Sequence, residues 1–294
     1  MEQSYWLHLT HEEAGELNAS AQQLHHAAQF VALFGNSLLP KASDDSQSNM
    51  EWLPGLKALA GQEANLRQRV RMALLYDTFE LQLIDENENA LGGLPLPGQN
   101  KSTALSFVRT QARMLGLKPS QVKPIAHFGL PEHELDKGAS FKMVGPAYHQ
   151  ELARYRHNAH FVLQGATEGF KFASPVATWP HHFDTGSVIT LAFDDSSNPV
   201  KTIGIGLAIA DRIADGFYFY VSPWQEKGKI NFGGLPTLPG NASWVTGQWN
   251  GAVLKLSDIV KLKTAEEQRQ LAEDFLNSAI EASQHLLGVE AVKA

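Results

Sequence analysis

The chain of 294 residues contains no cysteine. This absence excludes disulfide bonds, thiolate zinc sites, iron–sulfur clusters and a cysteine nucleophile, so any metal ion would need His, Asp or Glu ligands. Long apolar runs are also missing, because no segment approaches the ~18 consecutive apolar residues of a membrane-spanning helix. The first residues, MEQSYWLHLTHEEAGE, lack the basic start and apolar core of a secretory signal. We therefore expect a cytoplasmic protein that does not enter a membrane.

Positive charge is scarce and scattered along the chain. The net charge is −7 with histidine neutral, and the densest basic group is RQRVR at 67–71. Proteins bind nucleic acids and anionic membranes largely by neutralising phosphates, so we expect neither as a partner. Hydrophobic residues make up 43% and charged residues 19%, which is the composition of a globular protein and excludes a chain disordered throughout.

Several short sequences occur twice in the same order. GGLP stands at 92–95 and again at 233–236, and the pattern H-x-A-x-F-V begins at His26 and again at His157. Ordered landmarks of this kind indicate an internal duplication. The sequence therefore predicts two tandem, structurally similar halves.

Hydrophobic periodicity predicts the same order of elements in each half: a helix, an antiparallel strand meander, a loop and a closing helix. Apolar residues at helical spacing predict four helices, over 12–34, 101–116, 147–167 and 264–287. Alternating or short apolar runs predict strands at Arg71–Tyr76, Thr78–Ile84, Ser187–Phe193, Thr202–Ala210 and Gly216–Val221. Polar turns are expected at 85–89 and 194–199. The fold class is α+β, with an antiparallel sheet and helices on a face.

The predicted boundaries follow from this order. The first α+β repeat spans 1–116 and the second spans 147–294, with an inserted loop at about 241–264. Residues 117–146 hold four prolines and little periodicity, which predicts a linker or a covering loop. Each GGLP segment is expected to lead the chain out of its sheet.

The order of features resembles that of a family of uncharacterised, mainly bacterial proteins of about this length, known as a domain of unknown function. The resemblance covers nearly the whole chain and rests on Met114-Leu115-Gly116, Ser174-Pro175-Val176, Trp179, Phe183-Asp184 and the aromatic strand Phe217-Tyr218-Phe219-Tyr220. The chain departs from the family at Ala177, where a His is frequent, and at His181-His182, where small residues are usual. The family has no established activity, so the resemblance implies the fold more than the function.

The segment TWPHHFDTG (178–186) has no counterpart in the first half. In an extended strand His182 and Asp184 would share a face while His181 points away. One hypothesis is a divalent metal site formed by His181, His182 and Asp184 with His157 and His160 of the preceding helix. A second hypothesis makes His182 and Asp184 catalytic, with Asp184 orienting His182 as a general base. The alternative is structural: Asp184 caps a turn and the histidines are partly exposed.

The segment FYFYVSPW (217–224) alternates so that Phe217 and Phe219 share one face and Tyr218 and Tyr220 the other. These aromatics either form core or line a ligand site, in which case Trp179, Tyr218, Tyr220 and Trp224 would contact a small molecule. Two further tryptophans, Trp244 and Trp249, lie in a Gly- and Asn-rich segment that could form a lid.

Three functional hypotheses follow from these observations. The favoured one is a protein that binds a small molecule through its C-terminal half, because the catalytic set is incomplete. The second is a hydrolase-like enzyme that uses His182 and Asp184, with or without a divalent metal ion. The third is a non-catalytic scaffold that acts through protein contacts. The sequence leaves open whether the chain is an enzyme, and whether it assembles with itself or with another protein.

Overall fold

The computed structural model describes residues 6–10, 14–123 and 129–289, and these form two compact units. The N-terminal unit comprises the described residues of 12–153 and 177–183, and the C-terminal unit comprises those of 1–11, 154–176 and 184–294. The chain passes from one unit to the other within helix α3 (Pro146–Thr167), and again on either side of 177–183.

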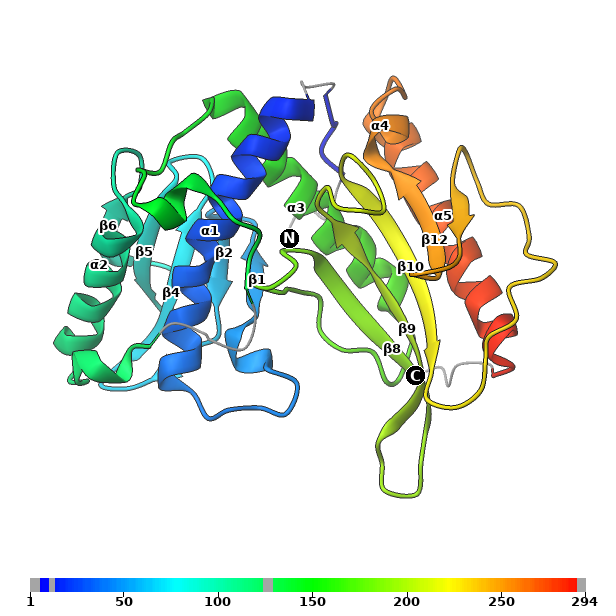
Figure 1. The fold of residues 1–294 in the computed structure, drawn as a ribbon, viewed down its shortest axis with the longest axis horizontal. Helices are drawn as coiled ribbons and strands as arrows, with labels where there is room; N and C mark the ends of the chain where they lie inside the picture. Colours follow the sequence, from blue (N-terminus) through cyan, green and yellow to red (C-terminus); the bar gives the residue numbers. More distant parts are fainter. Residues whose placement is uncertain (1–5, 11–13, 124–128, 290–294) are drawn as a thin grey trace. The chain divides into compact units, whose positions relative to one another are not determined.

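The N-terminal unit is built on an antiparallel meander. Its strands pair in the order β7, β1, β2, β4, β5 and β6, and β3 pairs with β4. Their bounds are β1 Met50–Leu53, β2 Ala58–Gly61, β3 Ala64–Asn65, β4 Arg69–Leu75, β5 Glu80–Asp85, β6 Ala90–Pro95 and β7 Ala177–Thr178. Helix α1 (Ala14–Leu38) packs against β2, β4 and β5, and α2 (Lys101–Met114) lies beside α1 and β6 (Figure 1).

The described part of the segment 117–146 belongs to the N-terminal unit and carries two short 3-10 helices, Pro119–Gln121 and Glu134–Lys137. A third 3-10 helix, Ser46–Ser48, follows α1. Phe141 is buried at 1% exposure, with its ring beside those of Phe30 and Phe79. Its backbone N–H donates to the carbonyl of Gln99 at 2.7 Å. This end of the segment therefore forms part of the core.

The C-terminal unit is a second antiparallel meander, in which the strands pair in the order β8, β9, β10, β12 and β11. Their bounds are β8 Thr185–Phe193, β9 Pro199–Ala208, β10 Tyr218–Gln225, β11 Ser243–Val245 and β12 Gly251–Lys255. Helix α5 (Ala265–Leu287) packs on β9, β10 and β12 (Figure 1). The part of α3 in this unit brings Tyr155 edge-on to Phe217, with ring centroids 5.1 Å apart.

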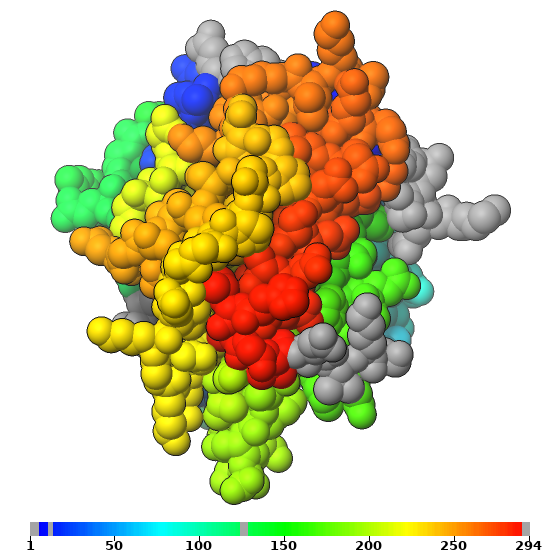
Figure 2. Space-filling view, turned by 90° about the vertical axis from the view of Figure 1, so that its right-hand side faces the viewer, coloured from blue at the N-terminus to red at the C-terminus, as the bar shows by residue number. Residues whose placement is uncertain are grey.

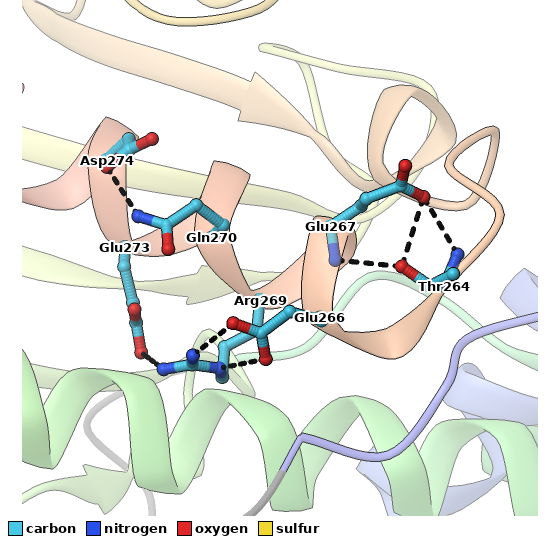
Figure 3. Close-up of polar contacts among 7 residues, drawn as sticks. All are labelled: Thr264, Glu266, Glu267, Arg269, Gln270, Glu273 and Asp274. Carbon is cyan, nitrogen blue, oxygen red and sulfur yellow. Dashed lines mark hydrogen bonds and ion pairs between the residues drawn. The ribbon is translucent and has the colours of Figure 1, made fainter.

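Helix α5 begins where the sequence predicts a helix start. Thr264 and Glu267 form a capping box, in which the Glu267 carboxylate accepts from the Thr264 backbone N–H at 3.0 Å and the Thr264 hydroxyl accepts from the Glu267 N–H at 3.1 Å (Figure 3). One turn later, Arg269 pairs with both Glu266 and Glu273 (Figure 3). The helix ends at Gly288, which has the left-handed conformation typical of this position.

The predicted inserted loop at 241–264 is wrong, because this segment contains β11, β12 and the short helix α4 (Leu256–Ile259). Strand β12 is buried along both faces except at Lys255, so its sequence GAVLK lacks the alternation that marks a half-exposed strand. Trp244 lies in β11 and donates its indole N–H to the Pro236 carbonyl at 3.0 Å, so it is part of a strand rather than of a lid loop.

The segment between β10 and β11 runs along the surface beside α5. Figure 2 shows this segment, in yellow and orange, next to the red helix. Gly240 lies against Leu271 of α5, because a Cβ atom at Gly240 would be 2.8 Å from Leu271 Cδ1.

The predicted α+β class is confirmed, since helices accompany extensive antiparallel pairing. The expectation for the GGLP segments is wrong for the first copy. Residues 92–95 belong to β6, where Gly92 and Gly93 pair with Leu83 and Gln82 of β5. The second copy lies outside the strands, and Gly234 there has a positive φ of 72°. The same GGLP sequence therefore adopts two conformations, because the first copy pairs with a neighbouring strand and the second does not.

The two predicted polar turns are present and share one hydrogen-bond pattern. Asp85 Oδ1 accepts from the backbone N–H groups of Asn87 and Asn89 at 2.8 and 2.9 Å. Asp194 Oδ1 accepts in the same way from Ser196 and Asn198 at 2.9 and 2.7 Å. Hydrogen bonds from Asn89 to Asp85 and from Asn198 to Asp194 lower the pKa of each carboxyl group. In both turns the side-chain amide has the larger effect and the backbone N–H the smaller. In the described part of the chain no helix is long and apolar enough to cross a bilayer.

Candidate functional site

The WPHHFD segment forms a turn anchored on α1. The Pro180 carbonyl lies 2.8 Å from His25 Nε2 and accepts from the Gln29 side-chain amide at 2.7 Å. Phe183 is buried and stacks on the His25 ring at 4.9 Å. Its N–H donates to the Trp179 carbonyl at 2.7 Å, and its φ of 56° places it in the left-handed region, which bulky residues rarely occupy. The packing of Phe183 holds this conformation in place.

The expectation that His182 and Asp184 share one face of an extended strand is therefore wrong. Residues 180–182 form a turn, and β8 begins only at Thr185. His182 is exposed, and its ring lies 4.5 Å from that of His181, which in turn lies 6.1 Å from the Trp179 ring. His182 belongs to the N-terminal unit and Asp184 to the C-terminal unit.

The two helix histidines of the metal hypothesis pack on one aromatic ring. The rings of His157 and His160 both lie near that of Phe161 in α3, with centroid distances of 4.7 and 5.3 Å, and His160 is buried. Over residues 6–10, 14–123 and 129–289, no group of three or more His, Asp or Glu side chains is placed to hold a metal ion.

Asp184 instead bonds a tyrosine of the sheet. The Tyr220 hydroxyl donates to Asp184 Oδ2 at 2.6 Å, and the Tyr218 hydroxyl donates to Asp211 Oδ2 at 3.0 Å. Burial raises the pKa of both phenols, and the nearby carboxylates raise it further. Both hydroxyls therefore remain protonated donors. Asp184 Oδ1 is buried and has no hydrogen-bond partner among the described residues.

Two glycines make room for Tyr220. A Cβ atom at Gly206 would lie 2.6 Å from the Tyr220 hydroxyl and 2.6 Å from the Thr185 carbonyl oxygen, and one at Gly186 would lie 2.9 Å from the same hydroxyl. The phenol ring therefore lies across Gly206 on the sheet surface. With its hydroxyl held by Asp184, the ring has a fixed position.

The cross-strand register places nine residues of β8, β9 and β10 on one face of the C-terminal sheet, because directly paired residues share a face and alternate residues along a strand do so too. The three rows are Tyr220–Gly206–Gly186, Ser222–Gly204–Val188 and Trp224–Thr202–Thr190. We call these residues the nine-residue grid. Phe217 and Phe219 point to the opposite face, toward Tyr155 of α3 and Trp6 respectively.

The grid is open at its centre and carries two exposed apolar side chains, Trp224 and Val188. Among the described residues other than Gly204 and its two chain neighbours, the only atom within 4 Å of a Cβ atom built at Gly204 is the Ser222 carbonyl oxygen, at 3.9 Å. Trp224 is 48% exposed and Val188 is 41% exposed. An open glycine in a strand interior marks a place where another molecule can approach the backbone closely.

The β11–β12 turn borders the grid on one side. Its Trp249 lies over Gly251, where a Cβ atom would be 2.4 Å from the indole, and its ring stands nearly perpendicular to that of Tyr220 at 6.5 Å. The Asn250 carbonyl accepts from the Ser222 hydroxyl at 2.9 Å. Trp249 thus forms a wall beside the floor made by Tyr220 and Gly204.

The structure brings some of the predicted residues together. Tyr218, Tyr220 and Trp224 share a face, as the alternation predicts, while Trp179 lies in the N-terminal unit. Sequence reasoning missed the contributions of β8 and β9, namely Val188, Thr190, Thr202 and Gly204. Alternation within each strand assigns such residues to a face, but nothing in the sequence gives the register between strands.

Comparison with family models, with curated proteins and with solved structures finds no match to this chain.

Proposed function

We propose that the protein binds a small ring-bearing molecule on the nine-residue grid. The observation that carries this proposal is the open position over Gly204, bordered by Tyr220, Trp224 and Val188. Exposed apolar side chains scattered singly are ordinary, but here two of them lie around a patch of bare backbone. Aromatic walls with a few polar groups are the usual lining of small-molecule sites.

Hydrogen bonds preorganise the grid and the turn beside it for ligand binding. Tyr220 is fixed by the Asp184 hydrogen bond, and the turn that carries Trp249 is tied to Ser222 through the Asn250 carbonyl. A ligand that stacks on such groups orders few side chains on binding, which favours affinity.

The proposal is tested by fluorine NMR of protein labelled with 5-fluorotryptophan, since the chain has only six tryptophans. The probes are uncharged ring compounds: indole, benzamide and a set of methyl glycosides and disaccharides. We expect at least one probe to shift the Trp224 resonance, assigned with Trp224→Phe, and to leave that of buried Trp52 unchanged. The variant Gly204→Val should remove the shift, because it places a side chain over the floor at a position where the Cβ atom has room.

The control is Gly216→Ala, which adds a side chain outside the grid, at a position where a Cβ atom would also meet no close neighbour. This variant should bind like the wild type. The proposal is overturned if no probe moves the Trp224 resonance, or if Gly204→Val and Gly216→Ala behave alike.

The hydrolase hypothesis with His182 and Asp184 ranks below binding. Asp184 Oδ2 is engaged by Tyr220, and His182 is exposed in a turn. The scaffold hypothesis also ranks below small-molecule binding. An open position over a glycine is better suited to a small molecule than to the flat surface of another protein.

We also propose that the two units derive from one duplicated pattern, with repeats at 1–116 and 147–294. Each unit contains an antiparallel meander whose strands are followed by a helix, α2 or α5, and the H-x-A-x-F-V pattern lies in a helix that precedes each meander. The differing GGLP conformations weigh against close equivalence. Superposing α1 on α3 tests the idea: a duplicated unit would bring the strands of both meanders into register in the same order. The resemblance to the uncharacterised family rests on the same sequence features.

A further inference from the structure

We infer that the ligand of the nine-residue grid is an uncharged saccharide of at least two rings. This inference rests on the proposed binding function and specifies its chemistry. It follows from the charge of the grid, from its hydroxyl groups and from the spacing of its aromatic side chains.

The grid carries no charged side chain. Its nine residues are Tyr, Trp, Val, two Thr, Ser and three Gly, and the Tyr220 phenol stays protonated because of its raised pKa. The carboxylate that bonds Tyr220, Asp184, lies outside the grid, with Oδ1 buried. A charged ligand group would lose hydration on this surface without gaining an opposite charge. The grid therefore favours a neutral ligand.

Two hydroxyl groups on the grid are available for a ligand. Thr190 and Thr202 lie directly opposite each other on β8 and β9, both partly exposed, and their side chains make no hydrogen bond within the described part of the chain. A hydroxyl both donates and accepts, which matches the hydroxyls of a sugar. An aromatic hydrocarbon lying here would separate these groups from water without replacing its hydrogen bonds, which is unfavourable.

Trp224 lies beside this threonine pair, directly opposite Thr202. Its exposed indole offers a π face of negative potential to the C–H groups on one side of a sugar ring, while the ring hydroxyls can reach Thr202 and Thr190. Apolar stacking combined with adjacent hydroxyl contacts is the chemistry by which a saccharide is recognised.

The spacing of the aromatics sets the length of the ligand. Tyr220 and Trp224 are four residues apart on β10, which corresponds to about 13 Å at ~3.3 Å per residue. Stacked rings lie within ~7 Å of each other, so one sugar ring cannot stack on both side chains. Linked rings that cross Gly204 can reach both, because no side chain stands between them at that position.

The test compares saccharides with aromatic probes of similar size by the same fluorine NMR measurement. The saccharides are cellobiose, maltose, chitobiose and lactose with their methyl monosaccharides, the neutral aromatics are indole and benzamide, and the charged sugar is glucuronate. We expect a disaccharide to shift the Trp224 resonance at lower concentration than its monosaccharide does. We expect glucuronate to bind at least tenfold more weakly than that disaccharide.

Two substitutions tie the binding to the grid. Trp224→Ala should weaken disaccharide binding at least tenfold, as measured by calorimetry. Thr202→Val, which replaces only the hydroxyl by a methyl group, should weaken it severalfold. Trp244→Ala is the matched control: it removes a partly exposed tryptophan from β11, outside the grid, and should leave affinity unchanged. Urea unfolding of each variant checks that the protein stays folded.

The outcomes separate the inference from the proposed function. Binding of indole or benzamide without any saccharide would overturn the inference and leave the binding function standing. Failure of every probe would overturn both. Saccharide binding that survives Trp224→Ala and Thr202→Val would place the sugar elsewhere and would also overturn the inference.

Discussion

Strand β10 supplies two surfaces of opposite character to the C-terminal sheet. On one face Phe219, together with Phe217 immediately before the strand, is buried against Trp6 and Tyr155. On the other face Tyr220, Ser222 and Trp224 border bare backbone. One strand thus contributes alternately to the core and to an open surface, so neighbouring residues should differ in whether they support stability or recognition. Three substitutions test this contrast, in order of decreasing effect on stability.

Phe219→Ala should have the largest effect. Phe219 is 1% exposed, so its removal loses the burial of a whole ring and leaves a cavity beside Trp6. We expect the free energy of unfolding in urea to fall by about 3–5 kcal/mol. A loss no greater than that of Trp224→Ala would show that the two faces do not differ.

Gly206→Ala should have an intermediate effect. The new methyl group would lie 2.6 Å from both the Tyr220 hydroxyl and the Thr185 carbonyl oxygen. We expect a loss of about 1–3 kcal/mol from overpacking, measured by urea unfolding. In the background Tyr220→Ala the same substitution should cost less, since only the backbone clash remains. Equal costs in both backgrounds would contradict the placement of the Tyr220 ring over Gly206.

Tyr220→Phe should have the smallest effect at neutral pH. It removes the donor to Asp184 Oδ2 and keeps the ring, so we expect a loss of about 1–2 kcal/mol in the free energy of unfolding. Ligands that stack on the ring should still bind. Gly204→Val, at a position where a Cβ atom has room, is the comparison for a change on the same face that keeps this hydrogen bond.

Tyr220→Phe should also change how the free energy of unfolding responds to alkaline pH. The pKa of Tyr220 is raised in the folded state, whereas in the unfolded chain it is about 10. Above this pH the unfolded state loses the phenol proton and the folded state keeps it, so stability present below pH ~10 is lost as pH rises. Urea midpoints measured from pH 8 to 11 should fall less steeply for Tyr220→Phe than for the wild type. Parallel slopes would contradict a buried, protonated phenol.

The elements that sequence predicts well are those with long, regular periodicity. The helices α1, α2, α3 and α5 and the strands β4, β5, β8, β9 and β10 agree with the expected segments within a few residues. The missed strands are short or lack alternation. β1 and β2 have four residues each, and β12 is buried on both faces. Such segments form strands because a neighbour pairs with them, and pairing partners are not visible in local periodicity.

The candidate site likewise combines features that the sequence predicts with features that it does not. The alternation of FYFYVSPW correctly assigns Tyr220 and Trp224 to one face. The sequence predicts His182, two residues away, as the partner of Asp184, but the partner is Tyr220, 36 positions further along the chain. A left-handed Phe183 breaks the extended geometry on which the local expectation depended. The hydroxyl pair of Thr190 and Thr202 depends on register, which only the folded sheet supplies.

The path of the chain between the two units constrains how the protein is made. Strand β7 and the turn that holds Phe183 belong to the N-terminal unit, although they are synthesised after α3 has entered the C-terminal unit. On the ribosome the N-terminal meander must therefore wait for Thr178 before Met50 gains its second strand partner. For the same reason, a gene fragment that ends anywhere before residue 183 encodes an incomplete N-terminal unit.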